Sequence, residues 1–267
     1  MKKTLIAIAL AAMMAPAWGA EVVSSNIVGY EKVNLVQGFN MVGLQFQYVG
    51  DASDTTRNIS DFGSLDSTFS GYDADYSYAT EMRVWDSTRQ GYVYYGWSGS
   101  SGTDIDDDPA YDNQWLDSAT EITDETLPVG AGVWIKAEKA GSITISGQVV
   151  NSDMTVSLVQ GFNLVANPYP QAVDVAKFGI LDSTFAGYDS DYSYATEMRV
   201  WDPARQSYVY YGWSGTSGTD IDDDPSYDNQ WLDSATEITT ETIPFGAAVW
   251  IKAEKAGTIT FSAPKAE

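Results

Sequence analysis

Two short acidic runs contain the side chains best suited to chemistry. The runs are Asp-Ile-Asp-Asp-Asp at 104–108 and again at 220–224. An Asn and further Asp residues follow each run within about ten positions. Alternating carboxylates on a tight loop can surround a hard cation such as Ca²⁺ with oxygen ligands at about 2.3–2.6 Å. The same carboxylates repel one another when no cation is bound. The candidate calcium ligands are Asp104, Asp106, Asp108 and Asp112 in and just after the first run, and Asp220, Asp222, Asp224 and Asp228 in and just after the second.

The spacing of these carboxylates differs from that of an EF-hand. Pro109 stands where the EF-hand loop needs a glycine, and Trp115 occupies the position of its bidentate glutamate. The alternative to a calcium site is a hydrated acidic loop that keeps the protein soluble. A weaker candidate of the same chemistry is the pair Asp73 and Asp75, which recurs as Asp189 and Asp191.

Aromatic residues form the second candidate site. In a strand, Tyr92 and Tyr94 lie on one face and Val93 and Tyr95 on the other, so one face belongs to the core and the other can be exposed. Flat rings beside Asp and Asn suit sugars, and Tyr and Trp are also enriched at protein interfaces. Ordinary cross-strand packing is the third interpretation. The candidate ligand or interface residues are Tyr92, Tyr94, Trp97, Trp115, Tyr208, Tyr210, Trp213 and Trp231.

The composition excludes several kinds of active site. The sequence contains no His and no Cys, which removes imidazole metal ligands, His-based triads and disulfides. Paired carboxylates can hydrolyse glycosides, but among 37 Asp and Glu residues such pairs arise by chance. No nucleophile and base stand in an enzyme motif. We therefore expect no enzymatic activity and no organic cofactor.

The first 20 residues are typical of a secretory signal peptide. Lys2 and Lys3 precede a short apolar run and then small residues, with cleavage after Ala17, Gly19 or Ala20 all fitting the pattern. We expect a protein outside the cytoplasm with no membrane span, since no later apolar run is long enough. The net charge of -23 opposes binding to nucleic acid or anionic lipid and attracts divalent cations.

The rest of the chain is an internal repeat. Residues 65–145 align without gaps with residues 181–261, and residues 35–42 align with 158–165 at a different offset. We therefore predict two tandem domains, 21–148 and 149–267, each of ordinary domain size.

Local patterns in both copies favour strands. Short β-rich segments broken by Gly, Asn, Asp and Pro predict an all-β fold with a β-sandwich or barrel-like domain in each copy. The only helical signals are short turns at 59–63 and 172–178. The principal predicted strands are 26–36, 39–46, 81–85, 92–97, 132–137, 142–146, 162–166, 248–253 and 258–262.

One motif resembles a known family. The sequence Gly-Phe-Asn-Leu-Val-Ala-Asn-Pro-Tyr-Pro at 161–170 is similar to the G-[WF]-N-L-[IV]-x-N-P-[YF]-[PS] signature, and Val-Trp-Asp at 200–202 and Gly-Ala-Ala-Val-Trp-Ile-Lys at 246–252 follow in the same order. The signature belongs to β-sandwich modules of secreted and surface proteins of Gram-negative bacteria. The resemblance implies that fold and an extracellular or cell-surface location, and it carries over no catalytic residue. The first copy departs from the signature at 43–46.

Two functions fit these observations. The first is a structural or surface-assembly protein that associates with itself or with other surface components as a filament or layer and is stabilised by calcium. Residues 21–26 resemble the joining segment 148–153, so the N-terminal strand of one molecule could dock on the second domain of another. The alternative is a carbohydrate-binding module that uses exposed Trp and Tyr to bind glycans.

Overall fold

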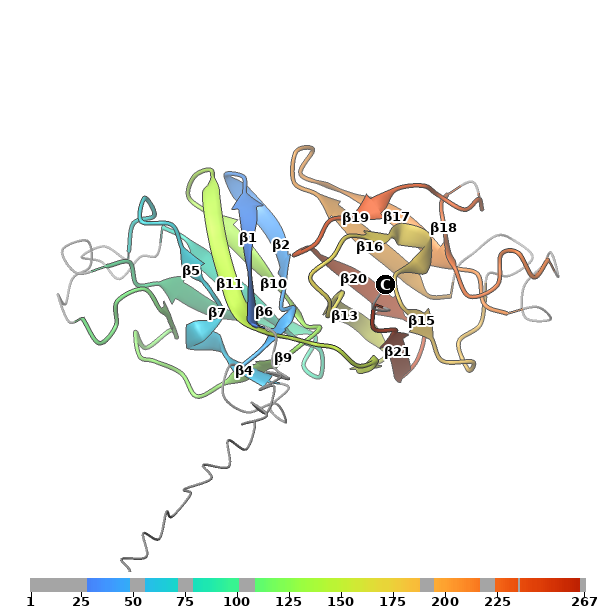
Figure 1. The fold of residues 1–267 in the computed structure, drawn as a ribbon, viewed down its shortest axis with the longest axis horizontal. Helices are drawn as coiled ribbons and strands as arrows, with labels where there is room; N and C mark the ends of the chain where they lie inside the picture. The colour runs from blue at the N-terminus through green and yellow to red at the C-terminus, as the bar shows by residue number, and fades with distance from the viewer. Residues whose placement is uncertain are drawn as a thin grey trace, which may run out of the picture.

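The protein is all-β and consists of two similar halves that lie side by side (Figure 1). The computed structural model describes residues 28–48, 56–71, 79–100, 109–187, 195–216, 224–234 and 236–264. Neither of the two helical turns in these ranges has the length that a membrane-spanning helix needs.

The first half contains three antiparallel sheets within the described ranges. Strand β1 pairs with β11, which also pairs with β3 and β5. A five-stranded sheet has the order β2-β10-β6-β7-β8, and β4 pairs with β9. The elements are β1 Val28–Leu35, β2 Gly38–Gly43, β3 Phe46–Gln47, β4 Thr56–Asn58, the 3-10 turn η1 Ile59–Asp61, β5 Ser64–Leu65, β6 Glu81–Asp86, β7 Gly91–Trp97, β8 Trp115–Leu116, β9 Thr126–Pro128, β10 Gly132–Ala137 and β11 Gly141–Val149.

The second half repeats this arrangement. Its sheets have the orders β12-β21-β15, β13-β20-β16-β17-β18 and β14-β19. The elements are β12 Met154–Leu158, β13 Gly161–Ala166, β14 Val173–Asp174, the 3-10 turn η2 Val175–Lys177, β15 Ile180–Leu181, β16 Glu197–Asp202, β17 Ser207–Trp213, β18 Trp231–Leu232, β19 Thr242–Ile243, β20 Ala248–Ala253 and β21 Gly257–Phe261. The predicted all-β class and the short helical turn in each half are confirmed.

A glycine and an asparagine of the repeated motif form the turn that joins the first two strands of each half. Gly38 has φ +98, which L side chains rarely adopt. Two residues later, Asn40 is buried, and its side chain accepts from Val36 N and donates to Val36 O, both at 2.9 Å. Asn163 and Val159 form the same pair of bonds in the second half. The motif therefore encodes a closed turn between two sheets.

Each half has its own hydrophobic core between its sheets. Alternation along β7 sends Val93, Tyr95 and Trp97 into this core and leaves Tyr92 and Tyr94 on the opposite face. The predicted strand 39–46 is interrupted, since β2 ends at Gly43 and the chain passes to the other sheet before β3. The short pairs β4-β9 and β14-β19 were not predicted.

Candidate functional site

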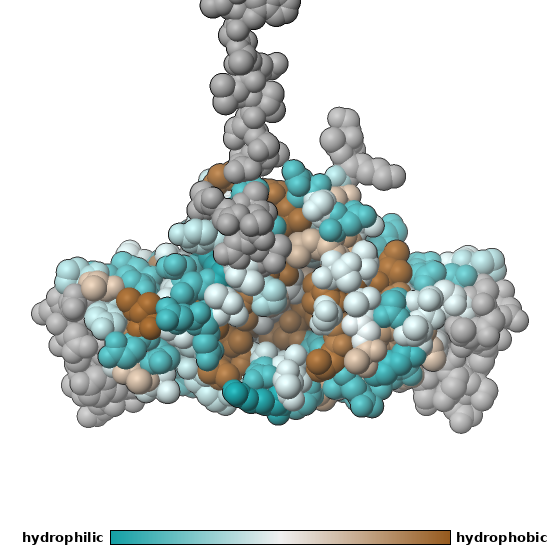
Figure 2. Space-filling view, turned by 90° about the horizontal axis from the view of Figure 1, so that it is seen from below, coloured by the Kyte–Doolittle hydropathy of each residue, from teal (hydrophilic) through white to brown (hydrophobic). Residues whose placement is uncertain are grey.

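The outer faces of the two five-stranded sheets meet between the halves. These are the faces that point away from each half's own core. They carry a third hydrophobic cluster, made of Met41, Trp134, Leu164, Ala166, Ala248 and Trp250, which we call the seam. Figure 2 shows hydrophobic residues gathered where the two halves meet, with hydrophilic residues toward both ends.

Trp side chains cross the seam in both directions. Trp85 of β6 donates from Nε1 to Phe162 O at 2.7 Å, and Trp201 of β16 donates to Phe39 O at 2.8 Å. The same rings meet the opposite half edge to face, with centroids 5.0 Å apart for Trp85 and Trp250. Because each contact recurs with the halves exchanged, the seam has the self-complementary character of a twofold dimer interface.

Backbone hydrogen bonds also join the halves. Gly43 N donates to Gly246 O at 2.8 Å, and Ala166 N donates to Gly130 O at 2.7 Å. Gln90 of the β6–β7 turn accepts from Phe162 N at 2.9 Å through its side-chain oxygen. These bonds fix the register of one half against the other.

An aromatic groove opens on the surface along the seam. It is a cavity of about 300 Å³ lined by Phe39, Arg83, Tyr92, Trp134, Trp201 and Tyr208. Tyr94 lies 6.3 Å from Tyr92, and Tyr210 lies 6.3 Å from Tyr208, measured between ring centroids. Tyr94 and Tyr210 are each 50% exposed. The two halves thus contribute two tyrosines each to one continuous aromatic surface.

An arginine of each half lies against the aromatic rings, and Arg83 lines the groove itself. The Arg83 guanidinium lies 4.9 Å from the Phe39 ring and 5.3 Å from the Tyr94 ring, and its Nη2 is 3.0 Å from Glu81. Arg199 has the same surroundings in the second half. The Nε atom of each arginine is buried and has no hydrogen-bond partner among the described residues. The groove therefore combines flat apolar rings with polar donors.

The phenol groups at the centre of the groove stay neutral at ordinary pH. Burial raises the pKa of Tyr92 and of Tyr208 above the usual value for a tyrosine. Trp250 Nε1 donates to the Tyr208 hydroxyl at 3.2 Å. Both hydroxyls can consequently donate and accept hydrogen bonds.

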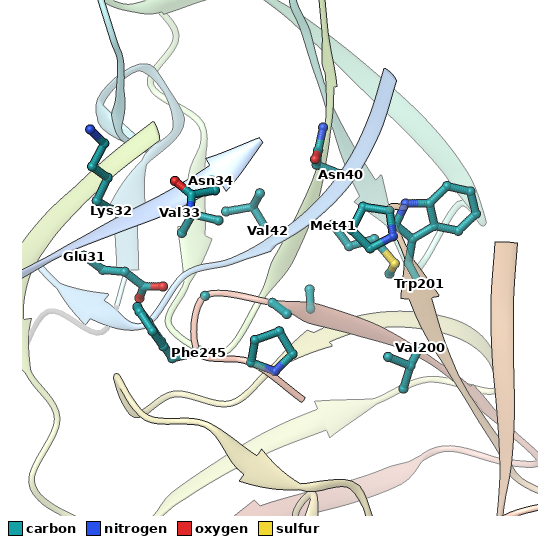
Figure 3. Close-up of a pocket in the computed structure, with 15 residues that line it drawn as sticks. Glu31, Lys32, Val33, Asn34, Asn40, Met41, Val42, Val200, Trp201 and Phe245 are labelled. Carbon is teal, nitrogen blue, oxygen red and sulfur yellow. The ribbon is translucent and has the colours of Figure 1, made fainter. Parts of the chain in front are cut away.

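A second cavity, the seam pocket, lies between β1 and the turn before β20. It measures about 250 Å³, and its walls are mainly apolar, including Val33, Met41, Trp201 and Phe245. Figure 3 shows the Glu31 carboxylate pointing into this space toward Phe245, while Lys32 points away.

Glu31 is the unusual group of the seam pocket. It is 3% exposed, and neither carboxylate oxygen has a hydrogen-bond partner among the described residues. Burial raises its pKa to about 7. The carboxylate lies directly over Gly246, where φ is +73 and a Cβ would collide with Glu31 Oε1.

For half of the candidate aromatic residues, the predicted role in binding is wrong. Trp97, Trp115, Trp213 and Trp231 are at most 2% exposed and lie in the two cores, so they cannot contact a ligand or a partner in this fold. Trp115 Nε1 donates to Gly63 O at 3.1 Å, which satisfies the indole inside the core. Tyr92 and Tyr208 line the groove, and Tyr94 and Tyr210 lie next to them, outside its lining.

Several groove and pocket residues were missed by sequence reasoning. Phe39 and Trp134 stand in the repeated G-F-N and V-W-I-K motifs, and strand alternation could have placed them on the outer face. Glu31 could have been noticed because the second copy has Met154 at the equivalent position.

The acidic runs are only partly described. Asp104, Asp106, Asp108, Asp220 and Asp222 lie outside the described residues, as do Asp73, Asp75, Asp189 and Asp191. Asp112 and Asp228 are half-buried, and Asp224 is exposed and accepts from Ser226 N at 2.9 Å, which lowers its pKa. Within the described ranges, three or more acidic side chains do not gather closely enough to hold a metal ion. The calcium site therefore stays a prediction.

No family model, curated protein or solved structure matches this chain. The resemblance to secreted β-sandwich modules likewise stays a prediction.

Proposed function

We propose that the protein is a secreted, non-enzymatic binding protein that holds an extended saccharide along the aromatic groove. The observation that carries this proposal is the row of four tyrosines that crosses the seam. Tyr94 and Tyr92 come from the first half, and Tyr208 and Tyr210 come from the second.

The groove has the two kinds of group that a sugar ring requires. The apolar C–H faces of a sugar can stack on the exposed rings of Tyr94 and Tyr210. The sugar hydroxyls can bond to the tyrosine hydroxyls and the guanidinium groups of Arg83 and Arg199. Because the row spans both halves, the ligand is expected to be an oligosaccharide and not a single sugar.

A glycan array with the mature protein tests this proposal. We expect binding to linear oligosaccharides, and we expect Tyr94→Ala or Tyr210→Ala to weaken it about tenfold, which corresponds to about 1.4 kcal/mol. Both side chains are half exposed, so their removal leaves the cores intact. The control is Tyr30→Ala on β1, because Tyr30 is 79% exposed and lies outside the groove. Equal binding by all three variants, or no binding to any glycan, would contradict the proposal.

Self-association is the second candidate function, and the seam supports it. The outer sheet face of one repeat already binds the same face of the other repeat. A protein built from self-complementary modules is suited to assembly into larger structures. In this proposal the acidic runs, including Asp106 and Asp222, bind calcium and stabilise the assembly.

Light scattering of the mature protein with and without calcium separates the two candidates. Assembly predicts species larger than one chain that grow when calcium is added and disappear when it is chelated. A protein that stays monomeric at high concentration with calcium present would exclude the assembly role and leave the saccharide proposal untouched.

A further inference from the structure

The seam pocket differs from its counterpart in a way that points to a ligand. The equivalent space on the other side of the seam is smaller, about 170 Å³, and is lined by Trp85, Val156 and Leu164 among others. Its strand β12 carries Met154 where β1 carries Glu31. The repeat therefore folds with an apolar residue at this position, and the carboxylate is a feature of the first copy alone.

An ionised carboxylate at this buried position destabilises the fold unless a positive charge lies next to it. Removing a charged group from water without a partner is strongly unfavourable. Among the described residues that line the pocket, Lys32 is the only Lys or Arg: β2, β16 and the turn before β20 contribute Asn40, Met41, Val200, Trp201 and residues 244–248. Strand β11, which pairs with β1, places Ile145 opposite Glu31. Lys32 is exposed and points away (Figure 3). The complementary charge can therefore come from a bound molecule.

We propose that the seam pocket binds a small organic amine, with its ammonium group on the Glu31 carboxylate and its apolar body along Val33, Met41 and Trp201. The pocket volume of about 250 Å³ is below that of a typical drug-sized site, which limits the ligand to a short alkyl or single aromatic body. An ionised Glu31 offers only hydrogen-bond acceptors and a negative charge, and an ammonium group supplies three donors and a positive charge.

The aromatic groove and the seam pocket are separate sites, although both include Trp201. The amine site can therefore be present whether or not the protein binds a saccharide. It would make the contact between the halves sensitive to the ligand, because Glu31 belongs to the first half and Phe245 to the second.

Calorimetry of the full mature protein tests this inference with benzylamine and n-butylamine as probes. Benzyl alcohol is the matched neutral compound. At about pH 8, above the raised pKa of Glu31, we expect at least one amine to bind once per chain, and benzyl alcohol to bind at least about tenfold more weakly than benzylamine. Amine affinity should fall as the pH drops below about 7, because Glu31 becomes protonated.

Two variants complete the test. Glu31→Gln keeps the shape of the side chain and removes its charge, and Glu31→Met installs the residue of the second copy. Both should lose amine binding by about tenfold or more, and thermal unfolding should show that both remain folded. The inference is overturned if neither amine binds at millimolar concentration, if benzyl alcohol binds as tightly as benzylamine, or if Glu31→Gln retains the wild-type affinity.

Discussion

Gly132 of β10 lies directly against Ala248 of β20, and the two residues are equivalent positions of the repeat. A Cβ on Gly132 would overlap the Ala248 Cβ and lie 2.9 Å from Leu164 Cγ. Gly43 and Ala166 form a second such pair, again from equivalent positions. Both pairs lie where an approximate twofold axis brings the same position of each half together. Each is a Gly–Ala pair, which avoids both the clash of two alanines and the void between two glycines.

Gly132→Ala should therefore strain the seam. Two methyl groups would compete for one space, and overpacking of this kind costs typically 1–3 kcal/mol, so about 2 kcal/mol is expected here. Urea unfolding followed by Trp fluorescence measures the change.

The matched control exchanges the two residues. In Gly132→Ala/Ala248→Gly the pair again contains one methyl group, so most of the lost stability should return, and the coupling energy of the double-mutant cycle should be large. If the double variant is no more stable than Gly132→Ala, the close approach of these two positions does not govern the seam.

The two Trp donors of the seam should contribute equally. Trp85→Phe and Trp201→Phe each remove one hydrogen bond to a backbone carbonyl, at Phe162 and Phe39 respectively. A net loss of about 1 kcal/mol is expected for each, because the glutamine of the same hairpin still donates to that carbonyl. Chemical denaturation measures both. A large loss for one variant and none for the other would show that the two halves do not share the seam symmetrically.

The secondary structure was predictable because local patterns decide it. Strand alternation placed Tyr92 and Tyr94 on one face, and the structure leaves both outside the core. The same alternation places Trp97 with Tyr95, and grouping Trp97 with the candidate ligand residues neglected that parity. Trp115 could not be placed in this way, because β8 has only two residues and shows no period.

The sequence alone does not predict the seam. Repetition predicts two similar halves, but it does not say which faces meet or whether they meet at all. Two sheets pack together only when the side chains of both faces are complementary in shape across the whole contact. In the seam this includes the close contact of Gly43 with Ala166. Strand alternation places Glu31 on the same face of β1 as Val33 and Leu35. It does not predict the pocket, because residues 200–203 and 244–248 of the second half form its other wall.

Glu31 should make stability depend on pH between about 4.5 and about 7. The folded state binds a proton on Glu31 in this range that the unfolded state releases, so the stability that Glu31 contributes is fully present below about 4.5 and is lost as the pH rises through about 7. Glu31→Gln removes this loss and should be more stable than the wild type above pH 7, by about 3 kcal/mol as an order of magnitude.

Denaturation of both proteins across this pH range gives the comparison. Lys32→Gln is the control, since it removes the neighbouring charge that points away from the pocket (Figure 3) and should keep the wild-type pH profile. Parallel pH profiles for the wild type and Glu31→Gln would mean that the buried carboxylate does not titrate in this window.

The two halves should behave differently when produced as separate chains. Each has its own core and keeps the seam face, so each exposes a self-complementary surface. In a dimer of first halves, Gly43 and Gly132 would each meet themselves, which leaves small gaps but no clash. In a dimer of second halves, Ala166 and Ala248 would meet themselves, and the paired methyl groups would hold the sheets apart. Sedimentation should therefore show dimers of the first half, monomers of the second half, and a one-to-one complex on mixing. Equal dimerisation of both halves would show that these glycines and alanines do not decide how closely the sheets approach.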